Sequence, residues 1–283
     1  MIEFPNPVPD IMGFTVSKQY GKLYFKNFRN FQSRIESVTK LIEQANAQYE
    51  IPDFPWTIVN LDDSRDPRCN VGLRVLSAST DDGNLSSCCP DWVFVNWIQS
   101  HIFDYEQTIN EMSAAGDQPA ETNLIGWRGN IDTHINRQNI NRFVDPNLYD
   151  FKVNRWKVDN IQDKPLEYSS DYVSLPDHVR RWRYLLDIEG MGYSGRNKML
   201  FFSKRVLFWQ CGPQREYYYD DLKPWVHYVP VARDFSDFEE NLKKIKENVE
   251  LEDSIRFAAF DYAQNNLRRE HAIKRWNKLL GGE

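Results

Sequence analysis

The chain has 283 residues, of which 41% are hydrophobic and 27% are charged, and its net charge is −6. This is the composition of a globular protein with enough volume for a real core, so an intrinsically disordered chain is excluded. The negative charge argues against a dedicated nucleic-acid-binding protein, because phosphate binding needs a clustered surplus of Lys and Arg.

The start of the chain, "MIEFPNPVPDIMGF", lacks a basic segment followed by a continuous apolar run, so we expect no secretory signal. No stretch approaches the roughly 20 apolar residues of a membrane span. Four cysteines, at positions 69, 88, 89 and 211, show no metal-ligand spacing. We expect reduced thiols in a cytoplasmic protein, with a redox pair of Cys88 and Cys89 as the alternative.

Helical and strand patterns alternate in the first half of the chain. Residues 30–48 carry apolar side chains at helical spacing and predict an amphipathic helix. Short β-branched and aromatic runs bounded by turn residues predict buried strands at 56–61, 71–78 and 92–97. "DYEQTINEM" predicts a second helix, and the polar segment 113–123 is the best linker candidate. The linker and the chain length favour two lobes, the first formed by residues 1–120.

The second half of the chain has the pattern of an α/β domain. "LIGWRGN" and "WRYLLDIEG" predict strands that end in glycine turns, "NKMLFFS" predicts a short helix, and "RVLFWQ" predicts another strand. "DFEENLKKIKENVE" and "SIRFAAFDYAQNNL" predict a pair of helices. This alternation predicts a parallel sheet with right-handed crossovers. We assign residues 121–265 to the second lobe, and residues 266–283 to a terminal helix that packs back on the first.

A glycine-rich stretch, "DIEGMGYSGRNKMLFFS", lies where a predicted strand gives way to a helix. In an open α/β sheet, ligands bind at the carboxyl ends of strands, where the next helix offers free N–H groups. Gly192 would let a diphosphate approach closely, and Ser194 and Arg196 can bond its oxygens. A second strand end, "GWRGN", presents Arg128 and Gly129 in the same way. The alternative is a loop whose glycines serve turn geometry, because the pattern matches neither the dinucleotide motif nor the P-loop.

Further along, "EYYYDDLKPWVHYVPVARDFSDFEENL" contains a Leu-x-Pro-Trp-x-His-Tyr-x-Pro-Val segment. Together with the glycine-rich stretch, "WRGN", "PDWVFVNW" and "VNLDDSRDP", it makes residues 56–232 resemble the family-90 glycosyltransferases. That family includes protein O-glucosyltransferases and fungal capsule-associated xylosyltransferases. The chain lacks the cysteine framework, signal and retention tail of the secreted animal members. It is most similar to the compact members of large algal viruses, which implies a viral protein in the host cytosol.

The resemblance implies an α/β fold of GT-B type, in which two Rossmann-like lobes enclose a cleft. Residues 1–120 would form the acceptor-side lobe and residues 121–265 the UDP-sugar-binding lobe. The implied activity is inverting, metal-independent transfer from a UDP-sugar, with UDP-xylose as the first donor and UDP-glucose as the alternative. The acceptor would be a hydroxyl group of a glycan or glycoprotein. No cofactor, metal site, nucleic-acid partner or membrane span is expected.

The resemblance also assigns roles to single residues of the donor side. The UDP diphosphate would be bound by Arg128, Gly129, Gly192, Ser194 and Arg196. Asp187 would fix the turn or bind the ribose. Of the triplet Tyr217, Tyr218 and Tyr219, Tyr218 is the first candidate to flank the uracil ring, and packing of the triplet in the core or at the rim is the alternative.

The catalytic base is expected in "VNLDDSRDP", which presents Asp62, Asp63 and Asp66 after a predicted strand. Inverting transfer needs one base to take the proton of the acceptor hydroxyl group. Matching Asn60 to the family's Asn-x-x-Asp segment selects Asp63, with Asn60 or Arg65 shaping its surroundings. The alternative is a solvated acidic turn without a catalytic role.

Two other classes of function remain open at this stage. A non-catalytic carbohydrate-binding module would use the same aromatic residues for stacking and would need no base, so it would tolerate Asp63→Asn. A nucleic-acid-binding protein would use "HVRRWRY", where three arginines surround Trp182, but the negative net charge opposes it.

Overall fold

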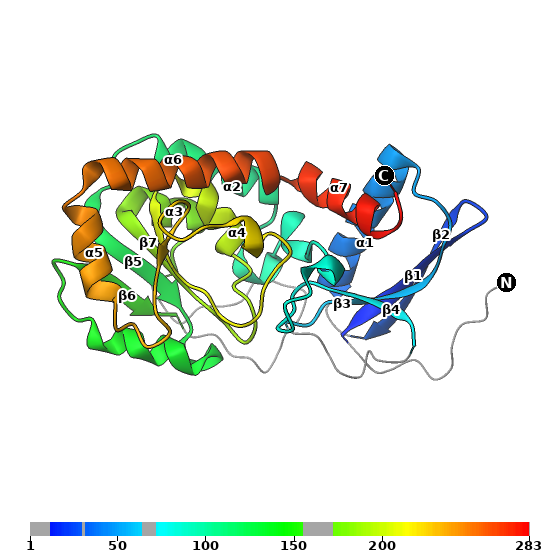
Figure 1. The fold of residues 1–283 in the computed structure, drawn as a ribbon, viewed down its shortest axis with the longest axis horizontal. Coiled ribbons are helices and arrows are strands. Elements are labelled where there is room, and N and C mark those ends of the chain that lie inside the picture. The colour runs from blue at the N-terminus through cyan, green and yellow to red at the C-terminus, as the bar shows by residue number, and fades with distance from the viewer. Residues whose placement is uncertain (1–11, 30–31, 64–71, 155–171, 283) are drawn as a thin grey trace.

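The computed structural model describes residues 12–29, 32–63, 72–154 and 172–282, and it contains two β-sheets toward opposite ends of an elongated molecule (Figure 1). The smaller sheet has the strand order β2-β1-β3-β4, and the larger sheet has the order β6-β5-β7-β8-β9. The strands are β1 (Gly13–Gln19), β2 (Lys22–Arg29), β3 (Phe54–Asn60), β4 (Arg74–Ser77), β5 (Thr122–Gly129), β6 (Tyr149–Val153), β7 (Trp182–Ile188), β8 (Val206–Gln210) and β9 (Val229–Pro230). The helices are α1 (Gln32–Tyr49), α2 (Tyr105–Gly116), α3 (Leu175–Arg181), α4 (Asn197–Leu200), α5 (Phe238–Lys246), α6 (Val249–Asn266) and α7 (Arg269–Leu279).

The smaller sheet begins with a hairpin that the sequence analysis did not predict. β1 and β2 are antiparallel and are joined by Tyr20 and Gly21, whose φ angles are 52° and 76°. Two positive φ angles give a turn whose twist matches that of the strands. The Asp53 carboxylate fixes this turn, because it accepts bonds from the amides of Tyr20 at 2.6 Å and Gly21 at 2.9 Å. β1 is also antiparallel to β3, so this sheet is mixed and differs from the Rossmann-like lobe expected here.

The larger sheet confirms the parallel α/β pattern predicted for the second half of the chain. All of its strand pairs are parallel. β5, β7 and β8 coincide with the predicted strands, and α4 to α7 coincide with the predicted helices. Alternate residues of the central strands fill different cores, with Leu185 and Leu207 on one face and Leu186 and Phe208 on the other. Burial on both faces explains why these strands read as continuous apolar runs.

Two of the sequence predictions fail between β4 and β5. The strand predicted at 92–97 is wrong, because Trp92–Phe94 form a 3-10 turn that Asp91 caps by accepting a bond from the Val93 amide at 3.2 Å. The predicted linker is partly helical, because α2 continues to Gly116. Beyond α2, the Arg205 guanidinium donates to the carbonyl oxygens of Gly116 at 3.2 Å and Gln118 at 2.6 Å. This segment is therefore held against the larger sheet.

One apolar core runs from the smaller sheet to the larger one. It includes Leu41 of α1, Ile109 of α2, Leu207 of β8 and Trp276 of α7. α6 crosses the larger sheet, and α7 continues from it to pack against α1 (Figure 1). The C-terminal helix therefore returns to the N-terminal part of the molecule.

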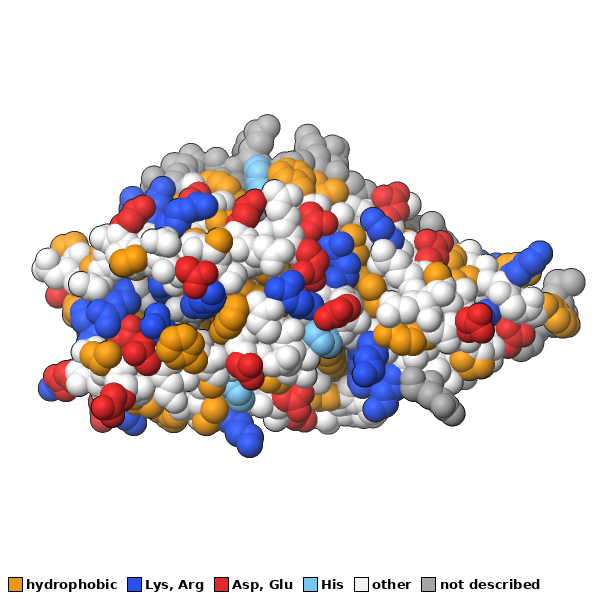
Figure 2. All heavy atoms as spheres, turned by 90° about the horizontal axis from the view of Figure 1, so that it is seen from above, with side chains coloured by type: hydrophobic (Ala, Val, Ile, Leu, Met, Phe, Trp, Pro, Cys, Tyr) orange, Lys and Arg blue, Asp and Glu red, His pale blue; other side chains and the backbone are white. Residues whose placement is uncertain are grey.

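Two features of the structure concern a membrane span and a nucleic-acid site. Within the described ranges, no helix is both long and apolar enough to cross a membrane. On the face seen in Figure 2, the described Lys and Arg side chains are intermixed with Asp and Glu. In the arginine-rich "HVRRWRY" segment, Arg180 pairs with Asp177, Arg183 pairs with Glu252 at 2.8 Å, and Trp182 is buried. These groups do not form the exposed basic and aromatic surface that nucleic-acid binding uses.

Candidate functional site

The candidate site lies at the carboxyl ends of β5 and β7. From β5 the chain passes to β6 on one side and then returns to β7 on the other side. The connections after these two strands therefore diverge, and ligands of open α/β sheets bind in the crevice at such a point. β5 ends with Arg128 and Gly129, and β7 is followed by the glycine-rich stretch. The two predicted strand ends are thus adjacent.

A cavity of about 280 Å³ opens at this crevice. Its wall includes Arg34, Asp63 and Trp97 from the N-terminal half of the chain. The larger sheet contributes Arg128, Gly129, Ser194 and Arg196, among others. The structure therefore brings together five of the residues that the sequence analysis selected, from segments more than sixty residues apart.

Arg128 is a rigid part of the cavity wall. Its guanidinium donates to both carboxylate oxygens of Asp150, at 2.9 and 3.1 Å, and to the Asp150 carbonyl oxygen at 2.7 Å. It also lies over the Trp182 ring, 4.7 Å from the ring centroid, and the Trp182 indole donates to Asp150 at 3.0 Å. A bidentate, stacked arginine loses little freedom when a ligand binds.

Arg196 is held so that one of its nitrogens remains available. Nε donates to Asp187 at 3.0 Å and Nη1 donates to the carbonyl oxygen of Arg128 at 2.7 Å. Nη2 is shielded from solvent and has no hydrogen-bond partner among the described residues. A buried donor of this kind normally has a partner, so Nη2 is suited to a ligand oxygen.

Asp187 is fully buried behind this wall and organises the turn. It accepts bonds from the Ser194 hydroxyl group at 2.9 Å, from Arg196 at 3.0 Å and from the Asn197 amide at 3.1 Å. It does not line the cavity, so its placement fits the first of its two expected roles, fixing the turn, and not binding of the ribose.

Asp63 faces the cavity from the segment after β3, and 37% of its side chain is exposed. Its carboxylate lies 3.2 Å from Nη1 of Arg34, whose guanidinium stacks on the Trp92 ring at 3.7 Å. The Ser79 hydroxyl group donates to the Asp63 carbonyl oxygen at 3.1 Å. Asp62 accepts a bond from the Asp63 amide at 2.8 Å and so stabilises the turn.

Two other residues that the sequence analysis placed beside the base, Arg65 and Asp66, lie outside the described residues. Asn60 is fully buried at the end of β3.

Gly192 has a different role from the predicted one, because it does not line the cavity. A Cβ atom at this position would lie 1.9 Å from the Asp63 carbonyl oxygen. The bare backbone of Gly192 is therefore required by the main chain of the candidate base, and not by a diphosphate.

The sequence pattern of the family described as Glycosyl transferase family 90 matches residues 11–282. The chain belongs to this family. The O-glucosyltransferase rumi of Drosophila melanogaster is 36% identical over 114 residues, which are 40% of this chain and 28% of that protein. Protein O-glucosyltransferase 1 of Homo sapiens is 33% identical over 108 residues, which are 38% of this chain and 27% of that protein. The matches thus span just over a quarter of these relatives.

Among solved structures, this family-90 chain is similar to a glycosyltransferase from Rickettsia africae ESF-5. The TM-score is 0.41 and the sequence identity is 9%, over 91% of this chain and 84% of that one. This similarity is too low to show a common fold or function.

Arg137 and His178 of this family-90 chain line the cavity but were not selected by the sequence analysis, since neither lies in the segments on which the family resemblance rests. Arg137 donates to the carbonyl oxygens of Asn130, Ile188 and Glu189 at 2.7 to 3.1 Å, at the ends of β5 and β7. Burial, with a contribution from the nearby Arg196, lowers the pKa of Arg137 to about 9.

The second missed residue is His178 on α3. It is buried, and its Nε2 has no hydrogen-bond partner among the described residues. Burial lowers the pKa of His178 well below its usual value, and the charges of Arg196 and Arg128 lower it further. His178 is therefore neutral at physiological pH.

Tyr218 does not lie at the cavity. It is 1% exposed and its hydroxyl oxygen lies 2.8 Å from Oε2 of Glu216, so the prediction that it flanks a uracil ring is wrong for this placement. Among the described residues, no group of three or more His, Cys, Asp and Glu side chains is arranged to hold a metal ion. Cys88 and Cys89 form no disulfide, and Cys69 lies outside the described residues.

Proposed function

We propose that this family-90 chain is an inverting, metal-independent glycosyltransferase of GT-B type. It moves a sugar from a UDP-sugar to a hydroxyl group of a glycan or glycoprotein. One observation supports this most strongly: a single cavity contains Asp63 from the N-terminal half together with Arg128 and Arg196 at the carboxyl ends of parallel strands. A base on one wall and anion-binding groups on the other are the parts that inverting transfer needs.

The donor side stabilises the leaving group. When the bond between sugar and UDP breaks, negative charge develops on the diphosphate. Arg196 Nη2 is fixed by the bonds of the same guanidinium to Asp187 and to the Arg128 carbonyl oxygen. Donors that are oriented before the reaction stabilise developing charge without reorganisation. In the proposed mechanism these guanidinium groups supply the positive charge, which makes a divalent metal unnecessary.

The acceptor side removes a proton. Asp63 takes the proton of the acceptor hydroxyl group while the oxygen attacks the anomeric carbon from the face opposite to UDP. Arg34, 3.2 Å away, pairs with this carboxylate and restricts its rotation. A general base of this kind contributes roughly 10²- to 10⁴-fold to the rate.

Two donor sugars are candidates, and different observations support them. UDP-xylose follows from the resemblance to the compact viral members of the family. UDP-glucose is supported by the names of the relatives, which are O-glucosyltransferases. The two sugars differ by one CH₂OH group, so a small change in the pocket wall decides between them.

The test is to incubate the purified protein with UDP-xylose, UDP-glucose, UDP-galactose and UDP-N-acetylglucosamine in the presence of EDTA. UDP release is followed by NMR for the wild type and for Asp63→Asn. We expect slow hydrolysis of one donor by the wild type and its loss in the variant. Release that is equal in the variant would exclude Asp63 as the base. Tight UDP binding without release from any donor, with or without glycan acceptors, would favour the carbohydrate-binding alternative.

A further inference from the structure

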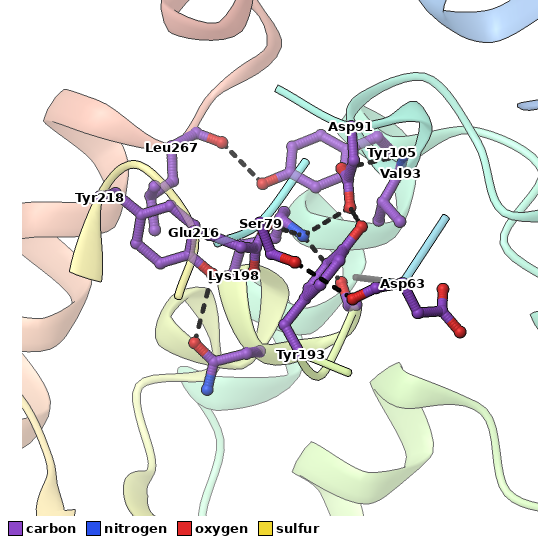
Figure 3. A network of polar contacts seen from close by, with 12 residues as sticks. Asp63, Ser79, Asp91, Val93, Tyr105, Tyr193, Lys198, Glu216, Tyr218 and Leu267 are labelled. Carbon is purple, nitrogen blue, oxygen red and sulfur yellow. Dashed lines mark hydrogen bonds and ion pairs between the residues drawn. The ribbon is translucent and has the colours of Figure 1, made fainter. Parts of the chain in front are cut away.

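A cluster of three ionisable side chains is buried behind the cavity, between the two halves of the chain (Figure 3). Asp91 and Lys198 are 0% exposed and Glu216 is 1% exposed. The Lys198 ammonium donates to Asp91 at 3.1 Å and to the Gly195 carbonyl oxygen at 3.1 Å, and it lies 2.8 Å from Glu216. Three acceptors therefore use all three N–H groups of the lysine. None of these three residues takes part in the mechanism proposed above.

A chain of hydrogen bonds links this cluster to the donor site. Oε2 of Glu216 lies 2.8 Å from the Tyr218 hydroxyl oxygen, which lies 3.3 Å from Oδ1 of Asn197. Nδ2 of Asn197 donates to Asp187 at 3.1 Å. Asp187 in turn holds Ser194 and Arg196. We call Glu216, Tyr218, Asn197 and Asp187 the Glu216 relay.

The donors and acceptors of the Glu216 relay can be counted, beginning at Asp187. Asp187 accepts bonds from two other donors, so it must face the NH₂ group of Asn197 and not the amide oxygen. The amide oxygen of Asn197 therefore faces Tyr218, whose single hydroxyl proton has two acceptors within reach, Oδ1 of Asn197 at 3.3 Å and Oε2 of Glu216 at 2.8 Å. Oε2 also lies 3.4 Å from the Tyr219 hydroxyl group. A protonated Glu216 can donate to Tyr218 and leave the Tyr218 proton for Asn197, so both contacts are then hydrogen bonds; an ionised Glu216 takes the Tyr218 proton and leaves the Asn197 oxygen without it.

The charges of the buried cluster also indicate that Glu216 is protonated. Lys198 and Asp91 neutralise each other, and a second carboxylate would leave one negative charge in a region with no solvent. Burial raises the pKa of Glu216 to about 8, and the charge of Asp91 adds to this, against the opposing effect of Lys198. A carboxyl group with this environment is protonated at neutral pH.

We propose that Glu216 is a neutral carboxylic acid and a positioning residue, whose proton sets the direction of the hydrogen bonds in the Glu216 relay and so holds Ser194 and Arg196 for the donor diphosphate. The positioning role rests on the proposed function, whereas the protonation of Glu216 does not. Loss of the proton would turn the Tyr218 hydroxyl group toward Glu216, leave the amide oxygen of Asn197 without a donor and release the turn.

Among the described residues, the charged neighbours of Glu216 are Lys198 and Asp91. Burial lowers the pKa of Lys198, but the nearby Asp91 charge opposes this, and the net effect is a raised pKa. The remaining titratable neighbours are tyrosines, and burial raises the pKa of each well above its usual value: Tyr105, Tyr193, Tyr217, Tyr218 and Tyr219. Glu216 is therefore the titrating group of this cluster.

The first experiment compares the wild type with Glu216→Gln by infrared difference spectroscopy. Glutamine keeps the size of the side chain, and its NH₂ group can donate to Tyr218 as the acid proton does. We expect a carbonyl band of a protonated carboxylic acid in the wild type at about pH 7, absent from the variant and lost from the wild type by about pH 9, one unit above the pKa. Absence of this band at neutral pH would overturn the proposal, whether or not the protein binds UDP.

The second experiment measures UDP affinity by calorimetry across the same pH range. With a pKa of about 8, the neutral fraction falls about tenfold between pH 7 and pH 9, so wild-type affinity should fall by about tenfold. The affinity of Glu216→Gln should change by no more than about twofold, because glutamine does not ionise and Arg137, with a pKa of about 9, loses only about half of its charge by pH 9. The matched control is Glu240→Gln, which removes an exposed glutamate of α5 and should follow the wild type.

A third variant tests the relay independently of whether Glu216→Gln folds correctly. Tyr218→Phe breaks the relay without changing any charge, and it should weaken UDP binding at every pH value while circular dichroism shows an unchanged fold. Identical pH profiles for the wild type and Glu216→Gln would refute the positioning role. If the wild type binds no UDP at all, the proposed function and the positioning role fail together, and the infrared band still decides the protonation of Glu216.

Discussion

Replacing Arg196 with lysine separates the charge of this side chain from its geometry. In the structure, Nε bonds Asp187 at 3.0 Å, Nη1 bonds the Arg128 carbonyl oxygen at 2.7 Å, and Nη2 has no partner among the described residues. One ammonium group cannot hold both of these partners and also reach a diphosphate oxygen. Loss of one hydrogen bond to a charged group removes about 1.5 to 3 kcal/mol. The affinity for UDP should therefore fall about 10- to 150-fold in Arg196→Lys.

Calorimetric titration with UDP and with uridine measures this effect. Affinity for UDP should fall in Arg196→Lys while affinity for uridine stays the same, because only UDP carries the diphosphate. Arg196→Ala should cost about 2 to 5 kcal/mol, since it also leaves Asp187 without its cationic partner. The control is Arg180→Lys, an exposed arginine that pairs with Asp177. Unchanged UDP affinity, or an equal loss for uridine, would refute the assignment of Arg196 to the diphosphate.

Three further predictions concern the base and the buried cluster. Asp63→Asn should lower the transfer rate about 10²- to 10⁴-fold and leave the Kd for UDP unchanged; a normal rate would contradict the base assignment. Lys198→Met leaves Asp91 as a buried charge without its partner, so the free energy of unfolding should fall by about 3 to 5 kcal/mol, measured by chemical denaturation. A loss below about 1 kcal/mol would argue against this charge balance. For Glu216, the pKa rises from 4.5 to about 8 on folding. The stability contributed by its neutral form is therefore complete below about pH 4.5 and is lost as the pH rises through 8, so the wild type should lose stability relative to Glu216→Gln across this range. A stability difference that does not depend on pH would be incompatible with a shifted pKa.

The position of the candidate donor-side residues could be predicted because its information is local. The strand, the turn and the candidate anion-binding side chains occupy one continuous segment that ends in Ser194 and Arg196. Parallel strands bring their carboxyl ends to one edge, so the "GWRGN" turn had to lie near by. The long apolar runs of β7 and β8 are buried on both faces, and such strands are the easiest to recognise.

The elements that were missed depend on contacts between distant residues. The hairpin of β1 and β2 turns at Tyr20 and Gly21, where the stabilising carboxylate of Asp53 lies 32 positions away from Gly21. Residues 92–97 have the composition of a strand, but the cap from Asp91 gives them a turn. Local propensity is a weak guide where a cap or a tertiary contact competes with it.

The buried cluster is the strongest case of this limitation. Asp91 and Lys198 are 107 positions apart, and nothing in either segment alone indicates that they meet. Tyr218 was expected at the ligand because aromatic residues often line sugar and base sites. Tyr218 is instead buried, and its side chain points into the polar cluster and not into the cavity.

Gly192 shows how the two halves of the site are spaced. The candidate base follows a strand of the smaller sheet and the proposed diphosphate site belongs to the larger one, so the distance between them depends on how the halves meet. They meet backbone to backbone, because Gly192 lies against the Asp63 carbonyl oxygen where a Cβ atom would be only 1.9 Å away. The next residue, Tyr193, donates to Asp91 at 2.8 Å and anchors the same loop to the N-terminal half. A displacement of about 1 Å in a catalytic group can reduce the rate about a hundredfold. A main-chain contact is suited to fix this distance, because the backbone moves less than a side chain does. In the proposed mechanism the glycine-rich stretch therefore has two roles, since Ser194 and Arg196 would bind the donor and Gly192 would set the position of Asp63.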